Sequence, residues 1–343
     1  MDVVLAAAGA SWEAAVIGEI ESSRSLRLVR RCVDVADLLT IARTDVASAA
    51  LVSTDLSGLD ADTVYRLEHA GGRVAAIEAD DGLCRGLGIE RRLSLGGLEA
   101  IALDLPLVAP DPVSSDAGRV VAVWGPAGAP GRSTVALGIA AAAAAKGVDT
   151  VLVDADTYGG ALAQMLAVLD DVSGLMAACR AANNGRPAEV VDHLLAIEPG
   201  LRLLTGLPRA DMWPQVRAGA LDLVLRHLRL AAELVVVDCG FAIEPGSGPG
   251  GASRNQSTLQ VLEQADEVVV VGRADPVGLA RLVRGVHDLQ EVLGQTPPKL
   301  VVNMMRSSLG WQEHELDSTV RRLTGVAPAA FLPFDQAGLD LAL

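Results

Sequence analysis

The sequence predicts an α/β protein with two doubly wound domains, each a parallel sheet covered by helices on both faces. Three observations lead to this expectation. Short apolar runs alternate with helical stretches along the whole chain. The runs hold four or five Val, Leu or Ile residues without polar alternation, which is what burial on both faces of a sheet requires. A proline-rich stretch divides this alternation in two, and 343 residues, half of them apolar, suffice for two cores.

The first domain is expected over residues 1–104, where apolar runs and helical stretches follow each other closely. The apolar runs lie at 3–8, 26–33, 49–52 and 73–77. The helical stretches lie at 12–22, 35–43, 61–69 and near Leu98, with a further segment at 82–88. Alternation at these lengths predicts a small doubly wound domain.

Residues 105–118 are expected to be a linker, because Pro106, Pro110 and Pro112 disfavour helix while serine and aspartate keep the stretch solvated. The second domain is then expected over residues 119–343. Its strands are predicted at 120–124, 150–153, 201–205, 234–237, 267–271 and 299–303, and its helices at 134–146, 218–231 and 276–292.

The charge balance excludes several classes of protein. The 43 acidic and 28 basic side chains give a formal net charge of −15. Unaided binding to nucleic acid or anionic lipid needs clustered cations, so no direct nucleic-acid contact is expected. The 4 Trp, 2 Tyr and 3 Phe residues are too few for a platform that stacks single-stranded bases.

The cysteines and the uncharged stretches indicate a cytoplasmic protein. The 4 cysteines are scattered and no secretory leader is visible, which favours a reducing compartment. The uncharged stretch at 133–145 is shorter than the ~20 residues that span a bilayer. No transmembrane segment is therefore expected.

The most informative segment, Val120–Ala140, has a buried strand, a glycine-rich turn and the start of a helix. Glycines let main-chain amides approach an anion, the helix N-terminus adds partial positive charge, and the Ser133 hydroxyl can ligate Mg²⁺. The residues expected to bind a nucleotide's phosphates are Gly125, Gly128, Gly131, Arg132, Ser133 and Thr134. The segment departs from GxxxxGK[ST] at Pro126 and Arg132. A glycine-rich turn without a ligand is the alternative interpretation.

Acidic residues follow two later strands. Asp154 and Asp156 end one strand, and Asp238 ends another after four apolar residues. Carboxylates at the carboxyl ends of parallel strands can share a crevice, where they hold Mg²⁺ or orient a water molecule. Asp154 and Asp156 are the candidate catalytic residues, and Ser133 and Asp238 the candidate metal ligands. Each acid could equally be an ordinary turn residue.

From Arg119 onward the sequence resembles the ParA/MinD family of deviant P-loop ATPases. The matching segments, in the family's order, are the loop at 125–134, DAD at 154–156, VVVDCG at 235–240, ADEVVVVGRADPVGLARL at 265–282, KLVVNMM at 299–305 and LPFDQAGLDLAL at 332–343. The resemblance implies bound ATP and Mg²⁺, a nucleotide-dependent homodimer and a protein partner. It also implies roles for Ser133 at the metal, Asp156 at the attacking water, Asp238 as the Walker B acid, Asn303 at adenine and Pro333 near the base.

The family's signature lysine, which reaches into the partner's site across the dimer, falls at Ala127. Alanine supplies no cation, and losing a group comparable to an arginine finger lowers turnover by about 10³–10⁵. The expected function is therefore ATP binding by a spatial regulator with weak or absent hydrolysis. Two alternatives stay open: an active Mg²⁺-dependent ATPase in which Arg273 or Arg254 replaces the lysine, and a pseudo-ATPase scaffold that binds no nucleotide.

The first domain resembles a response-regulator receiver, and its fusion to a MinD-type domain resembles the CpaE/TadZ branch and actinobacterial septum-site-determining-like proteins. The resemblance implies positioning at a pole or septum, by a partner, in pilus assembly or cell division. The first strand runs into alanines instead of a receiver's acidic pair, so Asp55, at the phospho-acceptor's place, is expected to be a turn residue. The segment 240–255 would be the family's second switch or flexible filler.

Overall fold

A computed structural model describes the chain except for Ala8, residues 43–46 and 103–116, Ala129, and residues 169–171, 246–252, 294–296 and 343. The described residues form two compact units, and each is treated separately below. The expected linker, 105–118, lies almost wholly outside the described residues, so the domain boundaries stay a prediction.

The first unit is a five-stranded parallel sheet. Its strands, in spatial order, are β2 (Arg27–Arg31), β1 (Asp2–Ala6), β3 (Ala49–Val52), β4 (Arg73–Ile77) and β5 (Arg91–Leu93). The connecting elements are α1 (Glu13–Ser22), α2 (Val35–Ala42), α3 (Ala61–His69), α4 (Asp81–Leu87) and the 3₁₀ helix η1 (Leu98–Ala102). The expected helix near Leu98 is thus a 3₁₀ helix, and β5 was not anticipated.

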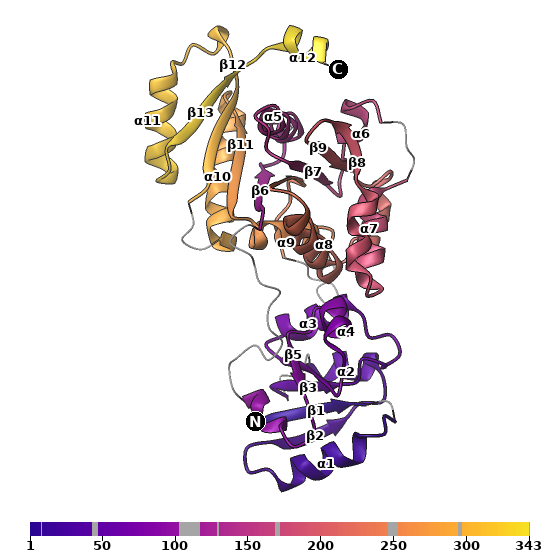
Figure 1. The fold of residues 1–343 in the computed structure, drawn as a ribbon. Helices are drawn as coiled ribbons and strands as arrows, with labels where there is room; N and C mark the ends of the chain where they lie inside the picture. The colour runs from indigo at the N-terminus through magenta and orange to yellow at the C-terminus, as the bar shows by residue number, and fades with distance from the viewer. Residues whose placement is uncertain are drawn as a thin grey trace. The chain divides into compact units, whose positions relative to one another are not determined.

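Two separate apolar clusters show that this sheet is covered on both faces (Figure 1). Successive residues of a strand point to opposite faces. Val4 of β1 accordingly packs with Leu38 of α2 and Val64 of α3, whereas the next residue, Leu5, packs with Val16 of α1 and with Leu98.

The second unit is an eight-stranded sheet in which β8 and β9 pair antiparallel and the other neighbours pair parallel. In spatial order its strands are β13 (Pro328–Pro333), β12 (Lys299–Met305), β11 (Glu267–Arg273), β6 (Arg119–Trp124), β10 (Leu234–Cys239), β7 (Thr150–Ala155), β9 (Leu201–Leu204) and β8 (Leu195–Glu198).

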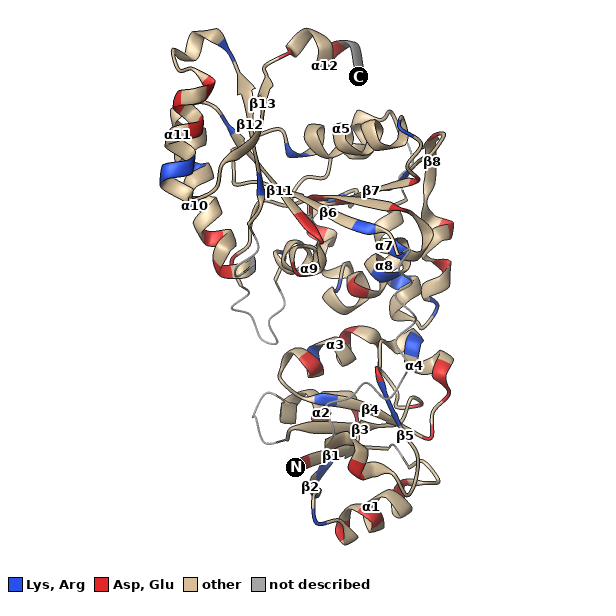
Figure 2. Cartoon of the chain, turned by 60° about the vertical axis from the view of Figure 1, so that its left-hand side comes forward, with Lys and Arg blue, Asp and Glu red and all other residues tan. Residues whose placement is uncertain are grey.

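The α-helices after residue 118 are α5 (Arg132–Ala144), α6 (Leu162–Met165), α7 (Gly174–Asn183), α8 (Ala218–Ala231), α9 (Gln256–Gln264), α10 (Pro276–Leu293), α11 (Glu313–Thr324) and α12 (Gln336–Ala342). The 3₁₀ helices are η2 (Pro187–His193), η3 (Ala210–Gln215) and η5 (Ser307–Leu309). In α11, acidic residues occupy the first turn and basic residues the last (Figure 2), which complements the helix dipole.

The order of connections places a crevice beside β6. The chain moves along the sheet in one direction through β6, α5 and β7, and in the opposite direction through β10, α9 and β11. Because such crossovers are right-handed, α5 and α9 cover opposite faces (Figure 1). Where the direction reverses, a crevice opens outside the carboxyl ends of the strands. The ends of β6 and β10 therefore border the natural ligand position.

The core of the second unit lies between α5 and the central strands. Val123, Leu152 and Val236 pack in one cluster with Val135 and Ala136 of α5, and the small alanines of α5 allow close approach to the sheet. These findings confirm the expected fold class of doubly wound α/β units. The exceptions are β8, which forms an antiparallel hairpin with β9, and β13, which begins at a proline; the sequence interpretation contained neither strand.

The four cysteines are free and buried. In the part of the chain that the structure describes, no helix is both long and apolar enough to cross a bilayer.

Replacing Leu152 by alanine is expected to lower the free energy of unfolding by about 2–5 kcal/mol, because the fully buried side chain leaves a cavity in the core. The matched control is Leu230→Ala on α8, whose side chain is 55% exposed and whose loss should change stability by less than about 0.5 kcal/mol. Urea unfolding followed by circular dichroism measures both. Equal losses in the two variants would contradict the assigned core.

Candidate functional site

The candidate site lies at the carboxyl ends of β6, β10 and β7. Strand register brings the acidic residues together, because Asp238 of β10 lies opposite Asp154 of β7 on one side and Val123 of β6 on the other. The loop after β6 leads directly into α5. The expected phosphate-binding loop and the expected acids therefore share one edge of the sheet.

The loop between β6 and α5 requires glycine at two positions. Gly128 and Gly131 have φ of +115° and +93°, a region that residues with a Cβ rarely adopt. A Cβ on Gly131 would also collide with the Asn303 amide. Gly131 is the N-cap of α5, and the first-turn N–H groups of a helix have no partner within it. This arrangement leaves main-chain donors for an anion.

Side-chain donors bind five of the loop's carbonyl groups. Arg132 Nη1 donates to the Gly125 carbonyl at 3.1 Å and to the Pro126 carbonyl at 3.5 Å, and Asn303 Nδ2 donates to the Pro130 carbonyl at 2.8 Å. From the other side of the loop, Arg281 Nη1 donates to the Ala127 carbonyl at 3.2 Å and Arg273 Nη1 to the Gly128 carbonyl at 3.4 Å. The loop conformation is thus supported from α5, β11, α10 and β12, and three of the four supporting groups are cations.

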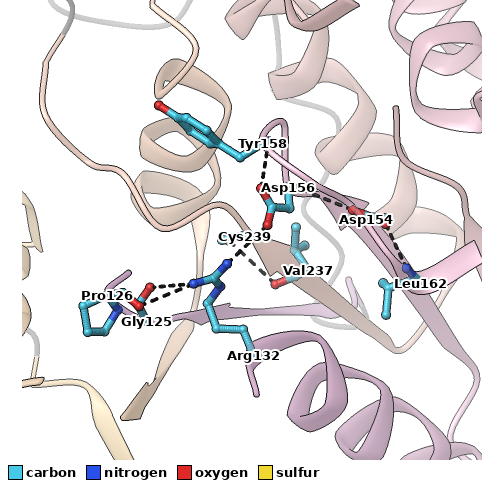
Figure 3. Close-up of polar contacts among 9 residues, drawn as sticks. All are labelled: Gly125, Pro126, Arg132, Asp154, Asp156, Tyr158, Leu162, Val237 and Cys239. Carbon is cyan, nitrogen blue, oxygen red and sulfur yellow. Dashed lines mark hydrogen bonds and ion pairs between the residues drawn. The ribbon is translucent and has the colours of Figure 1, made fainter. Parts of the chain in front are cut away.

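The Arg132 side chain turns away from the open part of the loop. Its guanidinium lies between the end of β6 and Asp156 (Figure 3), and its Nη2 donates to Asp156 Oδ2 at 3.3 Å. The two side chains are only 12% and 7% exposed. The other oxygen of Asp156, Oδ1, accepts a hydrogen bond from the Tyr158 N–H at 2.9 Å. Both oxygens of the expected catalytic acid are therefore engaged.

Asp154 supports the turn that follows β7. Its carboxylate accepts hydrogen bonds from the N–H of Asp156 at 3.3 Å and of Leu162 at 3.1 Å. Gly160 and Gly206 leave room for it, since a Cβ on either residue would collide with the carboxylate. Burial raises the pKa of Asp154 to about 7. These contacts give Asp154 a structural part in the turn, and no described contact joins it to the loop.

Asp238 is the acid without a partner. The residue is fully buried, and among the described residues neither carboxylate oxygen accepts a hydrogen bond. Burial and the neighbouring Asp154 raise the pKa of Asp238 to about 8, against the opposing effects of the Ser133 hydroxyl and Arg132. A buried unpaired carboxylate destabilises the fold.

The residues present fit a magnesium ion bound together with phosphate. Mg²⁺ prefers oxygen ligands and is held by one or two carboxylates plus phosphate oxygens. Asp238 has two free oxygens and the Ser133 hydroxyl is close enough to affect its pKa. Within the described part of the chain, no group of three or more His, Cys, Asp or Glu side chains could hold a metal by itself. These residues therefore favour a metal ion that is held jointly by the protein and by the phosphate oxygens of a ligand.

The remaining predicted residues lie around this centre. Asn303 lies in β12, two residues before the strand ends, and its Oδ1 accepts from the Met304 N–H at 2.8 Å. Pro333 ends β13 opposite Met305. Arg254 lies over the Tyr158 ring, 4.8 Å from its centroid, and donates to the Ala210 carbonyl at 2.9 Å. Arg254 thus has no described contact with the loop, unlike Arg273.

The segment after β10 contacts the turn after β7. Tyr158 Oη and Asn255 Oδ1 are 2.6 Å apart, and the Thr157 hydroxyl donates to the Arg254 carbonyl at 3.1 Å. Residues 246–252 of the expected second switch, 240–255, lie outside the described residues. The sequence gives no signal for a role of Tyr158. Arg281 lies within the segment 265–282, but nothing in that segment indicates that the side chain contacts the loop.

The Arg132–Asp156 pair is expected to contribute strongly to stability. Arg132→Met leaves a buried carboxylate near two others and should lower the free energy of unfolding by about 3–5 kcal/mol. Arg132→Met/Asp156→Leu should recover part of this loss, because no unpaired charge remains. The matched control, Arg321→Met, breaks the exposed Arg321–Asp317 pair and should cost less than about 1 kcal/mol. Urea unfolding gives the three values, and equal costs for the two single variants would contradict the buried pair.

Comparison with protein-family models gave no match, and comparison with curated protein sequences gave none either. Solved structures do match. The cell division ATPase MinD of Pyrococcus furiosus and a ParA family ATPase of Chlorobium tepidum each give a TM-score of 0.52, at 17% and 16% identity, over 66% of this chain and 89% of theirs. The septum site-determining protein MinD of Pyrococcus horikoshii, complexed with Mg-ADP, gives 0.50 at 16% identity, over 66% and 86%. These likenesses show that the chain contains a ParA/MinD-type α/β fold.

Proposed function

We propose that this protein is an ATP-binding spatial regulator of the ParA/MinD type, with weak or absent hydrolysis. The observation that carries the proposal is the unpartnered, buried Asp238 carboxylate beside a glycine loop that opens a helix. Such a carboxylate is costly in the protein alone and is satisfied when a divalent cation enters with a phosphate chain. The fold supports the same proposal.

Different residues would bind different parts of the nucleotide. The main-chain donors at Gly128 and Gly131 and in the first turn of α5 would bind phosphate oxygens, with Ser133 and Thr134 adding hydroxyl groups. Asn303 donates one amide hydrogen to Pro130 and has a second one for adenine. Pro333 would lie near the base.

Ser133 and Asp238 would hold the magnesium ion. When bound, Mg²⁺ neutralises the negative charge that builds up on the phosphate chain. Ser133 would supply a neutral oxygen from α5, and the Asp238 carboxylate the negative charge from β10. Deprotonation of Asp238, whose pKa is raised to about 8, would accompany metal binding.

Two features support slow hydrolysis: the hydrogen bonds already made by the Asp156 carboxylate, and an alanine, Ala127, at the position of the signature lysine. One oxygen of Asp156 accepts from Arg132 and the other from the Tyr158 N–H, and the side chain is only 7% exposed, so little of the carboxylate is open to a water molecule. Ala127 supplies no cation to the transition state. Both features favour binding over turnover.

The wider role is part of the same proposal. We propose that the chain forms a nucleotide-dependent homodimer and is recruited to a pole or septum by a protein partner, in pilus assembly or cell division. The first unit would be a receiver-like domain ending near residue 104. Its β1 ends in alanine without an acidic pair, and Asp55 donates its N–H to the Ser53 hydroxyl at 3.2 Å, as a turn residue does.

Addition of Mg-ATP at 100 times its Kd is expected to raise the Tm by about 5–10 °C, because a ligand that binds only the native state stabilises it. Ser133→Ala and Asp238→Asn should reduce the shift. Ser318→Ala, an exposed serine on α11, should leave it unchanged. Differential scanning calorimetry measures all four proteins. A wild type whose Tm ignores ATP would support the nucleotide-free scaffold instead.

Steady-state phosphate release by the wild type is expected to be no faster than by Asp156→Ala, because Ala127 supplies no cation to the transition state and the wild type is already expected to turn over at the background rate. A catalytic acid or base that acts on the attacking water typically contributes about 10²–10⁴-fold. A loss of that size in Asp156→Ala would establish the active Mg²⁺-dependent ATPase in place of the proposed regulator.

A further inference from the structure

A cavity of about 200 Å³ lies beside the glycine loop. One wall is formed by Pro126, Ala127 and Gly128 of the loop, and the other by the end of β11 and the start of α10. Two arginines, Arg273 and Arg281, line this second wall. The cavity therefore joins the expected phosphate loop to two guanidinium groups that come from a distant part of the sequence.

The two arginines differ in how firmly they are held. Arg273 Nη2 lies 2.7 Å from Asp275 Oδ2, and the same side chain donates to the Gly128 carbonyl. Asp275 is itself fixed by the Gly278 N–H at 3.0 Å, and this bond and Arg273 lower its pKa. Arg273 is thus neutralised by a fixed carboxylate and serves to support the loop.

Arg281 is exposed and forms no ion pair among the described residues. Its described hydrogen bond is the one from Nη1 to the Ala127 carbonyl. The guanidinium lies directly over Gly128, since a Cβ on that glycine would collide with Nη1. Arg132, the other arginine at the loop, is paired with Asp156. Arg281 is therefore the loop's cation without a neutralising carboxylate.

We propose that Arg281 binds the terminal phosphoryl group of a nucleoside triphosphate held by the loop, and so makes the site prefer triphosphate over diphosphate. The inference rests on the proposed nucleotide binding and names the residue that would distinguish a triphosphate from a diphosphate. A guanidinium forms paired, charge-assisted hydrogen bonds to phosphate oxygens. These bonds replace the neutral Ala127 carbonyl as acceptor, whereas a diphosphate has no group at that place.

The test compares the affinities of a non-hydrolysable ATP analogue, AMPPNP, and of ADP for the full chain, measured by calorimetric titration with Mg²⁺. Arg281→Ala should weaken AMPPNP binding by about tenfold or more, the effect of one charge-assisted hydrogen bond, and leave ADP binding unchanged. Arg281→Lys should restore part of the loss, because an ammonium keeps the charge without the paired geometry. Arg284→Ala, an exposed arginine farther along α10, is the matched control and should change neither affinity.

The outcomes separate this inference from the proposed function. A wild type that binds neither nucleotide overturns both. A wild type that binds both nucleotides, with an AMPPNP-to-ADP affinity ratio that Arg281→Ala does not alter, overturns the role of Arg281 and leaves the proposed function standing. Equal weakening of both nucleotides by Arg281→Ala also overturns it, because the arginine would then only support the loop.

Discussion

The ion pair between Arg132 and Asp156 organises the site. It links the first residue of α5 to the turn after β7, in a crevice where Asp154 and Asp238 are already buried. Without the guanidinium, three carboxylates would share one poorly hydrated space. Because burying like charges together is costly, the sequence of the loop and the acids at the strand ends constrain each other. An arginine here reaches Asp156 while also holding the Gly125 carbonyl, which a shorter ammonium side chain with rotating donors does less well.

The position of the site was predictable from the sequence, and the reason is topological. Buried strands followed by Gly125 and Asp238 were expected to end at one edge of a parallel sheet, which places the loop and Asp238 at the same edge. That β6 and β10 are direct neighbours is a finding of the structure. The same argument placed Asp154 and Asp156 at this edge. Backbone order was enough for these conclusions.

The directions of the side chains were not predictable in this way. Asp154 and Asp156 are two residues apart, yet one bonds to the N–H of Leu162 and the other to Arg132, because the turn after β7 folds back on the first acid. In the sequence, Arg281 resembles the other arginines that lie on helices. Its contact with the loop depends on how α10 packs, which the sequence does not show. β8 holds four residues at the sheet edge and β13 starts with Pro328, so neither shows the long apolar run of a central strand.

The close fit of Gly160 and Gly206 around the Asp154 carboxylate has a consequence for variation in this protein. These two glycines are far apart in sequence but both lie against the Asp154 carboxylate. A methyl group on either glycine would displace the Asp154 carboxylate. The N–H of Leu162 would then lose its acceptor, and the turn that carries Asp156 would be less firmly held. Substitutions at Gly160, Gly206 or Asp154 would therefore produce the same defect. A change at Gly206, which belongs to no recognisable motif, would disturb the crevice as much as a change of Asp154 itself.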